Sequence, residues 1–306
     1  MGSAWTVKIA GELPVPRAAL LEGVQSRFEA VNQALSTYRS SSALSRFNDQ
    51  DGADWVSIDP ELAAVMGYAL GLSERSHGAY DVTVGPLVDL WGFGPTPRTQ
   101  RQPDAAAIEA ARTRVGWRKV EVDVAGQRAR KQPGVRVDLS SLGKGRGVDR
   151  VAEYLDSQEL SNYLIDLSGK LRARGRNASG RPWRLAVELP GADAPDGTPR
   201  TVPGTLELVD ASVATAGDYR RFFEIDGRHY SHIIDPRSGV PVDHGTVSAT
   251  TMAATCMEAD ALATLLMVML PADALRLATD ARMPALLISR EATGFRLQPS
   301  PDWPLR

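Results

Sequence analysis

Apolar residues follow a helical period in two long stretches of the chain. Between Leu20 and Leu35 they are spaced by four, four, three and four residues, which predicts one face of a helix ending near Ser36. A second helix is predicted from Asp59, which can cap the first turn, with Pro60 at the first helical position. Residues 261–270 are almost continuously apolar but cover only about half the length of a membrane span, so they predict a buried helix.

Short apolar runs and alternating patterns predict strands through the rest of the chain. These strands are expected at 5–9, 82–84, 120–124, 135–139, 162–169, 183–190, 205–209, 222–225 and 285–289. Further helices are expected at 103–115 and 257–269, a serine-rich loop at 36–48, and a Pro/Gly-rich surface excursion at 190–204. Helices and strands interleave without a regular βαβ alternation. The pattern therefore predicts an α+β fold, with one domain over residues 1–306 built of two intimately packed lobes of mixed sheets and helices.

Charge and composition exclude some classes of partner. Lys and Arg number 35 against 37 for Asp and Glu, and no run of like charge indicates a nucleic-acid or membrane-surface partner. The one cysteine, Cys256, cannot form an internal disulfide and lies among apolar residues, as expected of a buried structural thiol. The first residues lack the basic and apolar regions of a signal peptide, so we expect either a cytoplasmic protein or the mature, trimmed form of an exported one.

A glycine-rich stretch, "VDLSSLGKGRGVDRVAEYL", is expected to form a loop that leads into a helix. Glycines at 143, 145 and 147 flank Lys144, so backbone N–H groups and a cation could face an anion there. The spacing matches neither a phosphate-binding P-loop nor a dinucleotide fingerprint. Close packing, for which glycine leaves room, is the alternative explanation.

Asp260 and Thr264 are four residues apart, so on a helix they share one face and offer two hard oxygen ligands suited to Mg²⁺. Such a pair also arises by chance in a chain of this size. The structural alternative is an Asp near a helix start and a Thr whose hydroxyl bonds back to a carbonyl.

Two further stretches combine aromatic or titratable residues with turns. Residues 78–94 could hold a planar ring with Tyr80, Trp91 and Phe93, or could simply place these three aromatics in the core. In "SHIIDPRSGVPV" a proline turn is expected to end a strand just past Ile234, so that His232 and Ile234 share one face of that strand. Taken alone, His232 fits a packed strand histidine as well as a catalytic one.

Six stretches taken together resemble the successive motifs of one family. In order they are "STYRSSSALSRFN", "YDVTVGPLVDLWGFG", "VDLSSLGKGRGVD", "YLIDLSGKLRARG", "SVATAGDYRRFFEIDGRHYSHIIDPRSGVPV" and "EADALATLLMV". They resemble the ApbE family, the FAD:protein FMN transferases, and the resemblance covers nearly the whole chain. It implies Mg²⁺-dependent transfer of the FMN half of FAD, through a phosphoester bond, to a Thr or Ser hydroxyl of a target protein, with release of AMP. The usual acceptors are flavin-carrying subunits of membrane redox complexes.

The resemblance also implies roles for individual residues. Asp260 and Thr264 match the magnesium side chains of the family, and Ser141 matches the position that offers a backbone carbonyl to the metal. His232 matches the histidine implicated in catalysis, and Asp260 is a second candidate for the base that activates the acceptor hydroxyl. The residues that match FAD-contacting positions are Met1, Tyr38, Ala79, Tyr80, Asp81, Asp138, Lys144 and Ile234.

The chain departs from the family pattern at three positions. Ser168 and Lys170 stand where a second glycine and often an acidic residue are usual, and Ala216 stands where serine is frequent. These changes keep two alternatives open: a flavin-binding protein without turnover, and a Mg²⁺-dependent FAD pyrophosphatase in which water replaces the acceptor hydroxyl. The resemblance further implies a periplasmic or cell-envelope location, with the export signal absent from this chain.

Overall fold

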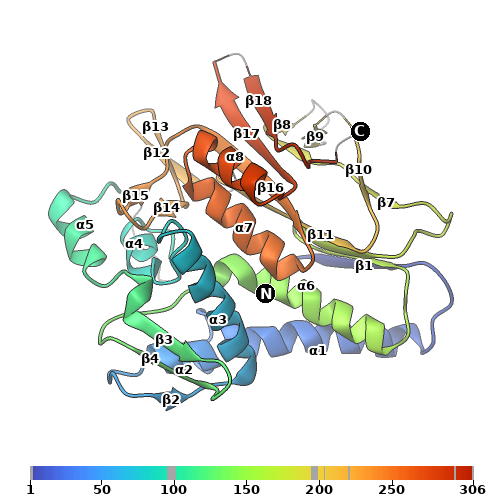
Figure 1. Ribbon diagram of the computed structural model, residues 1–306, viewed down its shortest axis with the longest axis horizontal. Coiled ribbons are helices and arrows are strands. Elements are labelled where there is room, and N and C mark those ends of the chain that lie inside the picture. Colours follow the sequence, from blue (N-terminus) through green and yellow to red (C-terminus); the bar gives the residue numbers. More distant parts are fainter. Residues whose placement is uncertain are drawn as a thin grey trace. The chain divides into compact units, whose positions relative to one another are not determined.

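The structure is a computed structural model, in which residues 3–94, 101–193, 199–202, 204–219, 221–292 and 294–304 are described. The chain forms two compact units (Figure 1). Unit 1 contains Met1–Glu29, Lys144–Tyr219 and His244–Arg306, and unit 2 contains Ala30–Gly143 and Arg220–Asp243. Both units mix helices with antiparallel strands, which confirms the α+β class. Among the described residues no helix has the length and apolar character needed to span a membrane.

A seven-stranded sheet organises unit 1, and each strand runs antiparallel to its neighbours. In spatial order the strands are β1 (Trp5–Ile9), β5 (Tyr163–Leu167), β6 (Lys170–Arg174), β11 (Ala211–Gly217), β16 (Thr246–Ala253), β17 (Ala285–Glu291) and β18 (Gly294–Pro299). The sheet therefore joins segments from both ends and the middle of the chain. The strands predicted at 5–9, 162–169 and 285–289 are confirmed.

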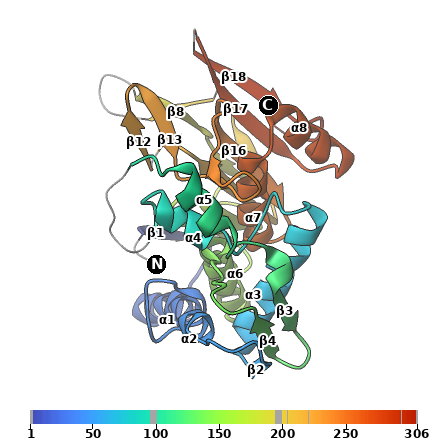
Figure 2. The same ribbon diagram turned by 90° about the vertical axis from the view of Figure 1, so that its left-hand side faces the viewer.

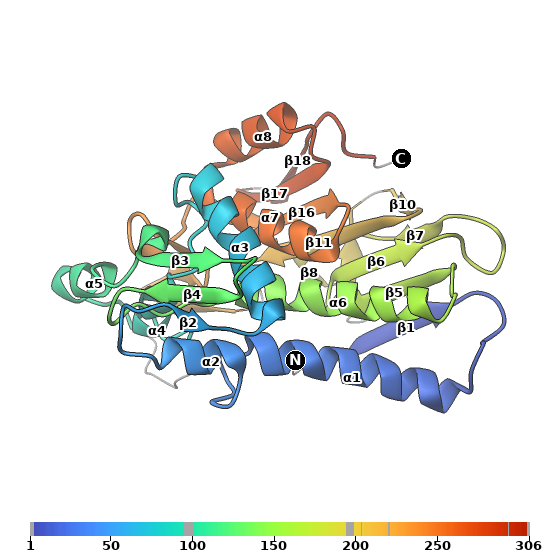
Figure 3. The same cartoon turned by 60° about the horizontal axis from the view of Figure 1, so that its bottom comes forward.

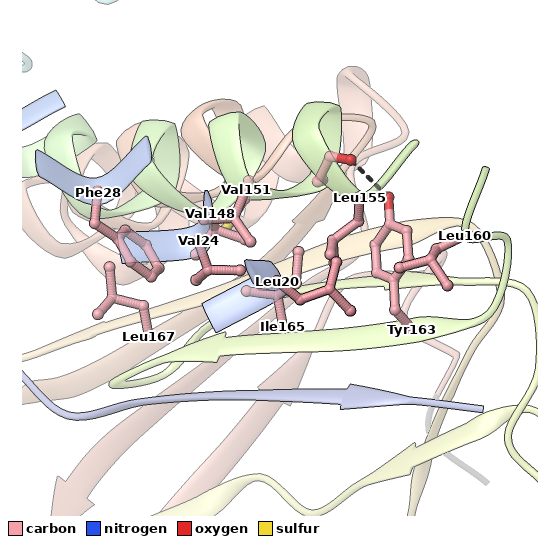
Figure 4. Packing of buried hydrophobic residues seen from close by; sticks show 12 residues of the cluster. Leu20, Val24, Phe28, Val148, Val151, Leu155, Leu160, Tyr163, Ile165 and Leu167 are labelled. Atoms are coloured by element: carbon pink, nitrogen blue, oxygen red, sulfur yellow. Dashed lines mark hydrogen bonds between the residues drawn. The ribbon is translucent and has the colours of Figure 1, made fainter. Parts of the chain in front are cut away.

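Helices pack against this sheet. They are α1 (Arg17–Leu35), α6 (Ser140–Ser157), α7 (Cys256–Val268), which lies on β11 and β16, and α8 (Pro271–Asp280), which lies on β17. Figure 3 shows α1 and α6 side by side beneath the sheet. In Figure 4 apolar side chains of α1 and α6 meet alternate residues of β5, including Tyr163, Ile165 and Leu167. Every second residue of β5 faces this core, as the two-residue period of a strand requires.

The residues of β5 and its neighbours that point the other way form a second core. Leu164, Ala173 and Val213 pack there with the pair β7 (Trp183–Leu185) and β10 (Leu206–Leu208). The backbone of β8 (Glu188–Asp193) pairs with that of β9 (Pro199–Thr201), so the excursion predicted at 190–204 contains a strand pair. Residues 194–198 and 203 of that excursion lie outside the described residues.

Unit 2 is built of short helices and short strands. Its helices are α2 (Ala43–Asn48), α3 (Pro60–Arg75), α4 (Gly85–Leu90), α5 (Ala105–Arg112) and the short 3₁₀ helix η1 (Trp117–Lys119). Its strands are β2 (Val56–Ser57), β3 (Val120–Asp123), β4 (Arg128–Lys131), β12 (Phe222–Ile225), β13 (Arg228–Ser231), β14 (Ile234–Asp235) and β15 (Val240–Pro241). Helix α3 packs on the sheet β2-β4-β3, and α4 lies beside α5 (Figures 1 and 2).

Three predicted elements of unit 2 are wrong, two of them because of a local side-chain hydrogen bond. The serine-rich loop contains α2, because the Ser42 side chain accepts the N–H of Ser45 and caps a helix there. Residues 82–84 form no strand: the Asp81 carboxylate accepts the backbone N–H and the hydroxyl of Thr83, which closes a turn.

Residues 135–139 also form no strand, since their backbone bonds elsewhere. The N–H and the carbonyl of Val137 both bond the side chain of Asn48, and the N–H of Asp138 bonds the carbonyl of Val82. Strand β3 pairs instead with β4. The predicted two-stranded unit exists, but its second strand lies earlier in the chain than the apolar alternation indicated.

Candidate active site

In unit 1, candidate chemistry centres on the carboxylate of Asp260 in α7. The helix begins with a capping box in which the Thr255 side chain accepts the N–H of Glu258 and Glu258 reaches back to the N–H of Thr255. Asp260 is 2% exposed. Its Oδ2 accepts the N–H of Gly145 at 3.0 Å, and its Oδ1 lies 2.8 Å from the Lys170 ammonium. Both oxygens of this buried carboxylate therefore have a partner.

Lys170 comes from the start of β6 and is itself buried. The preceding turn, with Ser168 at φ 51° and Gly169 at φ 84°, brings the chain sharply from β5 into β6. Besides Asp260, the Lys170 ammonium bonds the backbone carbonyl of Thr215 in β11. Lys170, which departs from the family pattern, thus forms an ion pair with Asp260, a predicted magnesium ligand.

Thr264 lies one turn beyond Asp260, and the two residues share a helix as predicted. Its hydroxyl donates to the backbone carbonyl of Asp260 at 3.1 Å. This is the bond from a threonine back to a carbonyl that was the structural explanation of the spacing. A carboxylate and a hydroxyl are the right donor types for Mg²⁺, so the residues fit the ion in kind. Among the described residues no group of three or more His, Cys, Asp and Glu side chains is arranged to hold a metal.

Asp149 supports this arrangement from α6; it lies within the motif "VDLSSLGKGRGVD", but no role was predicted for it. Its carboxylate accepts the N–H groups of Cys256 and Met257 at the start of α7, each at 2.8 Å, and pairs with Arg172 at 2.8 Å. A carboxylate at a helix N-terminus complements the helix dipole. Burial raises the pKa of Asp149, and burial together with this carboxylate raises the pKa of the Cys256 thiol. Cys256 is a free, buried cysteine, as predicted.

The glycine-rich stretch lies inside α6, which begins at Ser140, so the predicted loop before the helix is wrong. A Cβ on Gly145 would lie 2.4 Å from the carbonyl oxygen of Cys256, whereas one on Gly143 would meet nothing within 4 Å. At position 145 close packing explains the glycine. Lys144 stands in the same helix, between these two glycines in sequence.

In unit 2, four of the predicted flavin and metal positions make hydrogen bonds. The hydroxyl of Tyr80 bonds that of Ser141 at 2.7 Å, and Asp138 accepts the N–H of Ser140 at the start of α6. Asp81 accepts the Thr83 bonds and the N–H of Trp117. Burial raises the pKa of Asp81, against the lowering effect of these hydrogen bonds.

Histidine 232 lies between strands β13 and β14, so the prediction that it shares a strand face with Ile234 is wrong. Its backbone N–H and its Nδ1 both lie within hydrogen-bond distance of the Arg221 carbonyl, at 3.2 and 3.1 Å. A carbonyl oxygen only accepts, so in the neutral ring Nδ1 carries the hydrogen. The nitrogen with the basic lone pair is then Nε2, as a general base requires.

The remaining predicted contacts differ in their burial. Ala79 is buried, Tyr38 is 67% exposed, and Met1 lies outside the described residues. Ile234 is buried in an aromatic cluster with Trp91, Phe93 and others, where Trp91 stacks on Tyr230 and Phe93 on Phe223. Trp91 and Phe93 are therefore core aromatics, the alternative given for residues 78–94.

Comparison with known proteins decides the family. The model of the ApbE family matches residues 1–287. This chain belongs to the ApbE family. The FAD:protein FMN transferase of Vibrio cholerae is 39% identical over 298 residues, which cover 97% of this chain and 87% of that relative. The enzyme of the same name from Haemophilus influenzae is 37% identical over 301 residues, with 96% and 86% covered.

Solved structures of ApbE-family proteins agree with the fold. The flavin transferase ApbE from Vibrio cholerae matches with a TM-score of 0.90 at 37% identity, covering all of this chain and 96% of that one. The apo form of the Pseudomonas stutzeri flavinyl transferase ApbE matches at 0.89 and 35% identity, with 99% and 93% covered. The predictions of an ApbE-like fold and of an enzyme of the transferase class are confirmed.

Proposed function

We propose that this ApbE-family protein transfers the FMN half of FAD to a Thr or Ser hydroxyl of an acceptor protein and releases AMP. The observation that carries the proposal is the match over residues 1–287 to a family whose relatives are named FAD:protein FMN transferases. In this reaction the hydroxyl oxygen attacks the FMN phosphorus and the pyrophosphate P–O bond breaks. AMP leaves with the bridging oxygen, and the hydroxyl proton passes to a base.

His232 is the base that we assign to this step. Its Nδ1 is held by the Arg221 carbonyl, so Nε2 is the atom that takes the proton from the acceptor hydroxyl. A hydroxyl is a weak nucleophile near neutral pH, and proton removal in the transition state is the help that a histidine can give. Asp260, the second candidate, has both carboxylate oxygens engaged by Lys170 and Gly145, which favours His232.

A divalent cation, Mg²⁺, is part of the proposal. Asp260 and Thr264 would hold it with their side-chain oxygens, and Ser141 would offer its backbone carbonyl. When bound, such an ion neutralises charge that develops on the pyrophosphate as the P–O bond breaks. The residues proposed to contact FAD in unit 2 are Tyr38, Ala79, Tyr80, Asp81, Asp138 and Ile234, and in unit 1 Met1 and Lys144.

The acceptor that we propose is a flavin-carrying subunit of a membrane redox complex, and the proposed location is the periplasm or cell envelope. Both follow from the family resemblance. Fractionation of the producing cells, with the protein detected by antibody, tests the location: recovery in the cytoplasm alone would contradict it.

One experiment tests the reaction. The protein is incubated with FAD, Mg²⁺ and an acceptor domain bearing a reactive threonine, and both acceptor mass and AMP are measured. Transfer predicts a covalent FMN adduct and one AMP for each adduct. Free FMN with AMP and no adduct would show an FAD pyrophosphatase instead, and unchanged FAD would show a flavin-binding protein without turnover. An acceptor whose threonine is changed to alanine is the control.

A further inference from the structure

The buried ammonium of Lys170 competes for the carboxylate that the proposed metal needs. The side chains of Lys170 and Asp260 are 5% and 3% exposed, and their charged atoms are 2.8 Å apart. In an interior that screens charge weakly, a divalent cation at Asp260 would also lie close to this ammonium and be repelled by it. The two cations therefore compete for Asp260 Oδ1.

The other contacts of the pair favour the ammonium in the cation-free protein. Asp260 Oδ2 already accepts the N–H of Gly145, and the Lys170 ammonium has a second acceptor in the Thr215 carbonyl. A buried carboxylate is costly unless it is paired and hydrogen-bonded, and here both conditions are met without a metal. The Thr264 hydroxyl is likewise satisfied, by the Asp260 carbonyl.

We propose that Lys170 is a tethered competitor of the divalent cation at Asp260, so that the cation binds only when the ammonium leaves the carboxylate. The inference rests on the proposed metal site of the transferase. Its consequence is specific to this chain: the affinity for a divalent cation is set by the residue at position 170, and it rises when that residue loses its charge.

The test measures metal binding without turnover. Mn²⁺, a hard cation that favours the same oxygen ligands, is titrated into the full-length protein without FAD, and free Mn²⁺ is followed by electron paramagnetic resonance. Lys170→Met keeps an unbranched chain but removes the charge, and we expect it to bind Mn²⁺ about 10- to 100-fold more tightly than the wild type. Lys170→Arg retains the charge and should bind as weakly as the wild type. Asp260→Asn in the Lys170→Met background should abolish the gain.

Each outcome decides a different point. Equal affinity in the wild type and Lys170→Met would overturn the competition and leave the metal site intact. Absence of Mn²⁺ binding in all variants would overturn the metal at Asp260 and the competition with it. Flavin transfer to the acceptor, measured separately, reports on the proposed reaction whatever the titration shows.

The wild type alone also tests the inference, should Lys170→Met fail to fold. Competition predicts that the wild type saturates with Mn²⁺ only in the millimolar range. Saturation at micromolar Mn²⁺, lost in Asp260→Asn, would overturn the proposal without any variant at position 170.

Discussion

Gly145 is the residue at which helix α6 touches the start of helix α7, and adding one methyl group there should force the two helices apart. A Cβ at this position would lie 2.4 Å from the Cys256 carbonyl oxygen and 2.8 Å from the Met257 Cα. Both are backbone atoms, which cannot rotate out of the way as a side chain can. Separation of the helices would also break the bond from the Gly145 N–H to Asp260 Oδ2.

The expected cost of Gly145→Ala is the balance of three effects. Alanine in place of glycine favours the helix by up to about 1 kcal/mol. Overpacking of a tight contact costs about 1–3 kcal/mol. Loss of a hydrogen bond to a charged, buried carboxylate costs about 1.5–3 kcal/mol. The free energy of unfolding should therefore fall by about 1.5–5 kcal/mol, which is a large share of the stability of an ordinary domain.

Urea-induced unfolding, followed by circular dichroism, measures this difference. Gly143→Ala is the matched control, since it makes the same change in the same helix where a Cβ would meet nothing within 4 Å. It should leave the free energy of unfolding unchanged or raise it by up to about 1 kcal/mol. The reasoning is refuted if Gly145→Ala is as stable as Gly143→Ala, because the close helix contact would then not require glycine.

Three further changes test the site and its supports. Thr255→Ala removes the capping box of α7 and should lower the free energy of unfolding by about 1 kcal/mol, with Thr255→Ser close to the wild type in urea titrations. Asp149 has a pKa raised by burial above its ordinary 3.8, so the folded protein holds this proton to a higher pH than the unfolded chain does. This contribution lowers the free energy of unfolding of the wild type as pH rises from about 4. The difference in that free energy between the wild type and Asp149→Asn should therefore shrink as pH rises. An increase of this difference with pH would contradict a raised pKa of Asp149. His232→Ala should slow flavin transfer by about 10²- to 10⁴-fold, while His229→Ala, a change in the neighbouring strand, should not; equal rates for both would remove His232 as the base.

The spacing of apolar residues predicted the long elements because the same residues are buried when these elements pack together. The apolar positions from Leu20 to Phe28 are those that α1 buries, and alternate residues of β5 face the helices as their spacing indicated. Asp59 accepts two N–H groups at the start of α3, as its position before Pro60 predicted. In these cases every signal lies within one helix or one strand.

Two other expectations were wrong because groups distant in the sequence determine the local structure. Nothing near Val137 in the sequence shows that its N–H and carbonyl are bonded by Asn48, which lies 89 residues earlier. The glycines of α6 raised the expectation of a loop, because glycine usually weakens a helix. The reason for Gly145 is the start of α7, more than a hundred residues away in the chain.

The Asp260 site shows how a family motif can identify residues without showing the state they are in. Any buried carboxylate must be neutralised or hydrogen-bonded, and a proton, an ammonium or a metal ion can each contribute. In this chain an ammonium from β6 and an N–H from α6 do so, so the fold of unit 1 does not need a metal to satisfy Asp260. A cation at this position would therefore contribute to the chemistry of flavin transfer rather than to the stability of the fold. In the proposed competition, the residue at position 170, which lies outside the motif around Asp260, sets how readily a cation would enter.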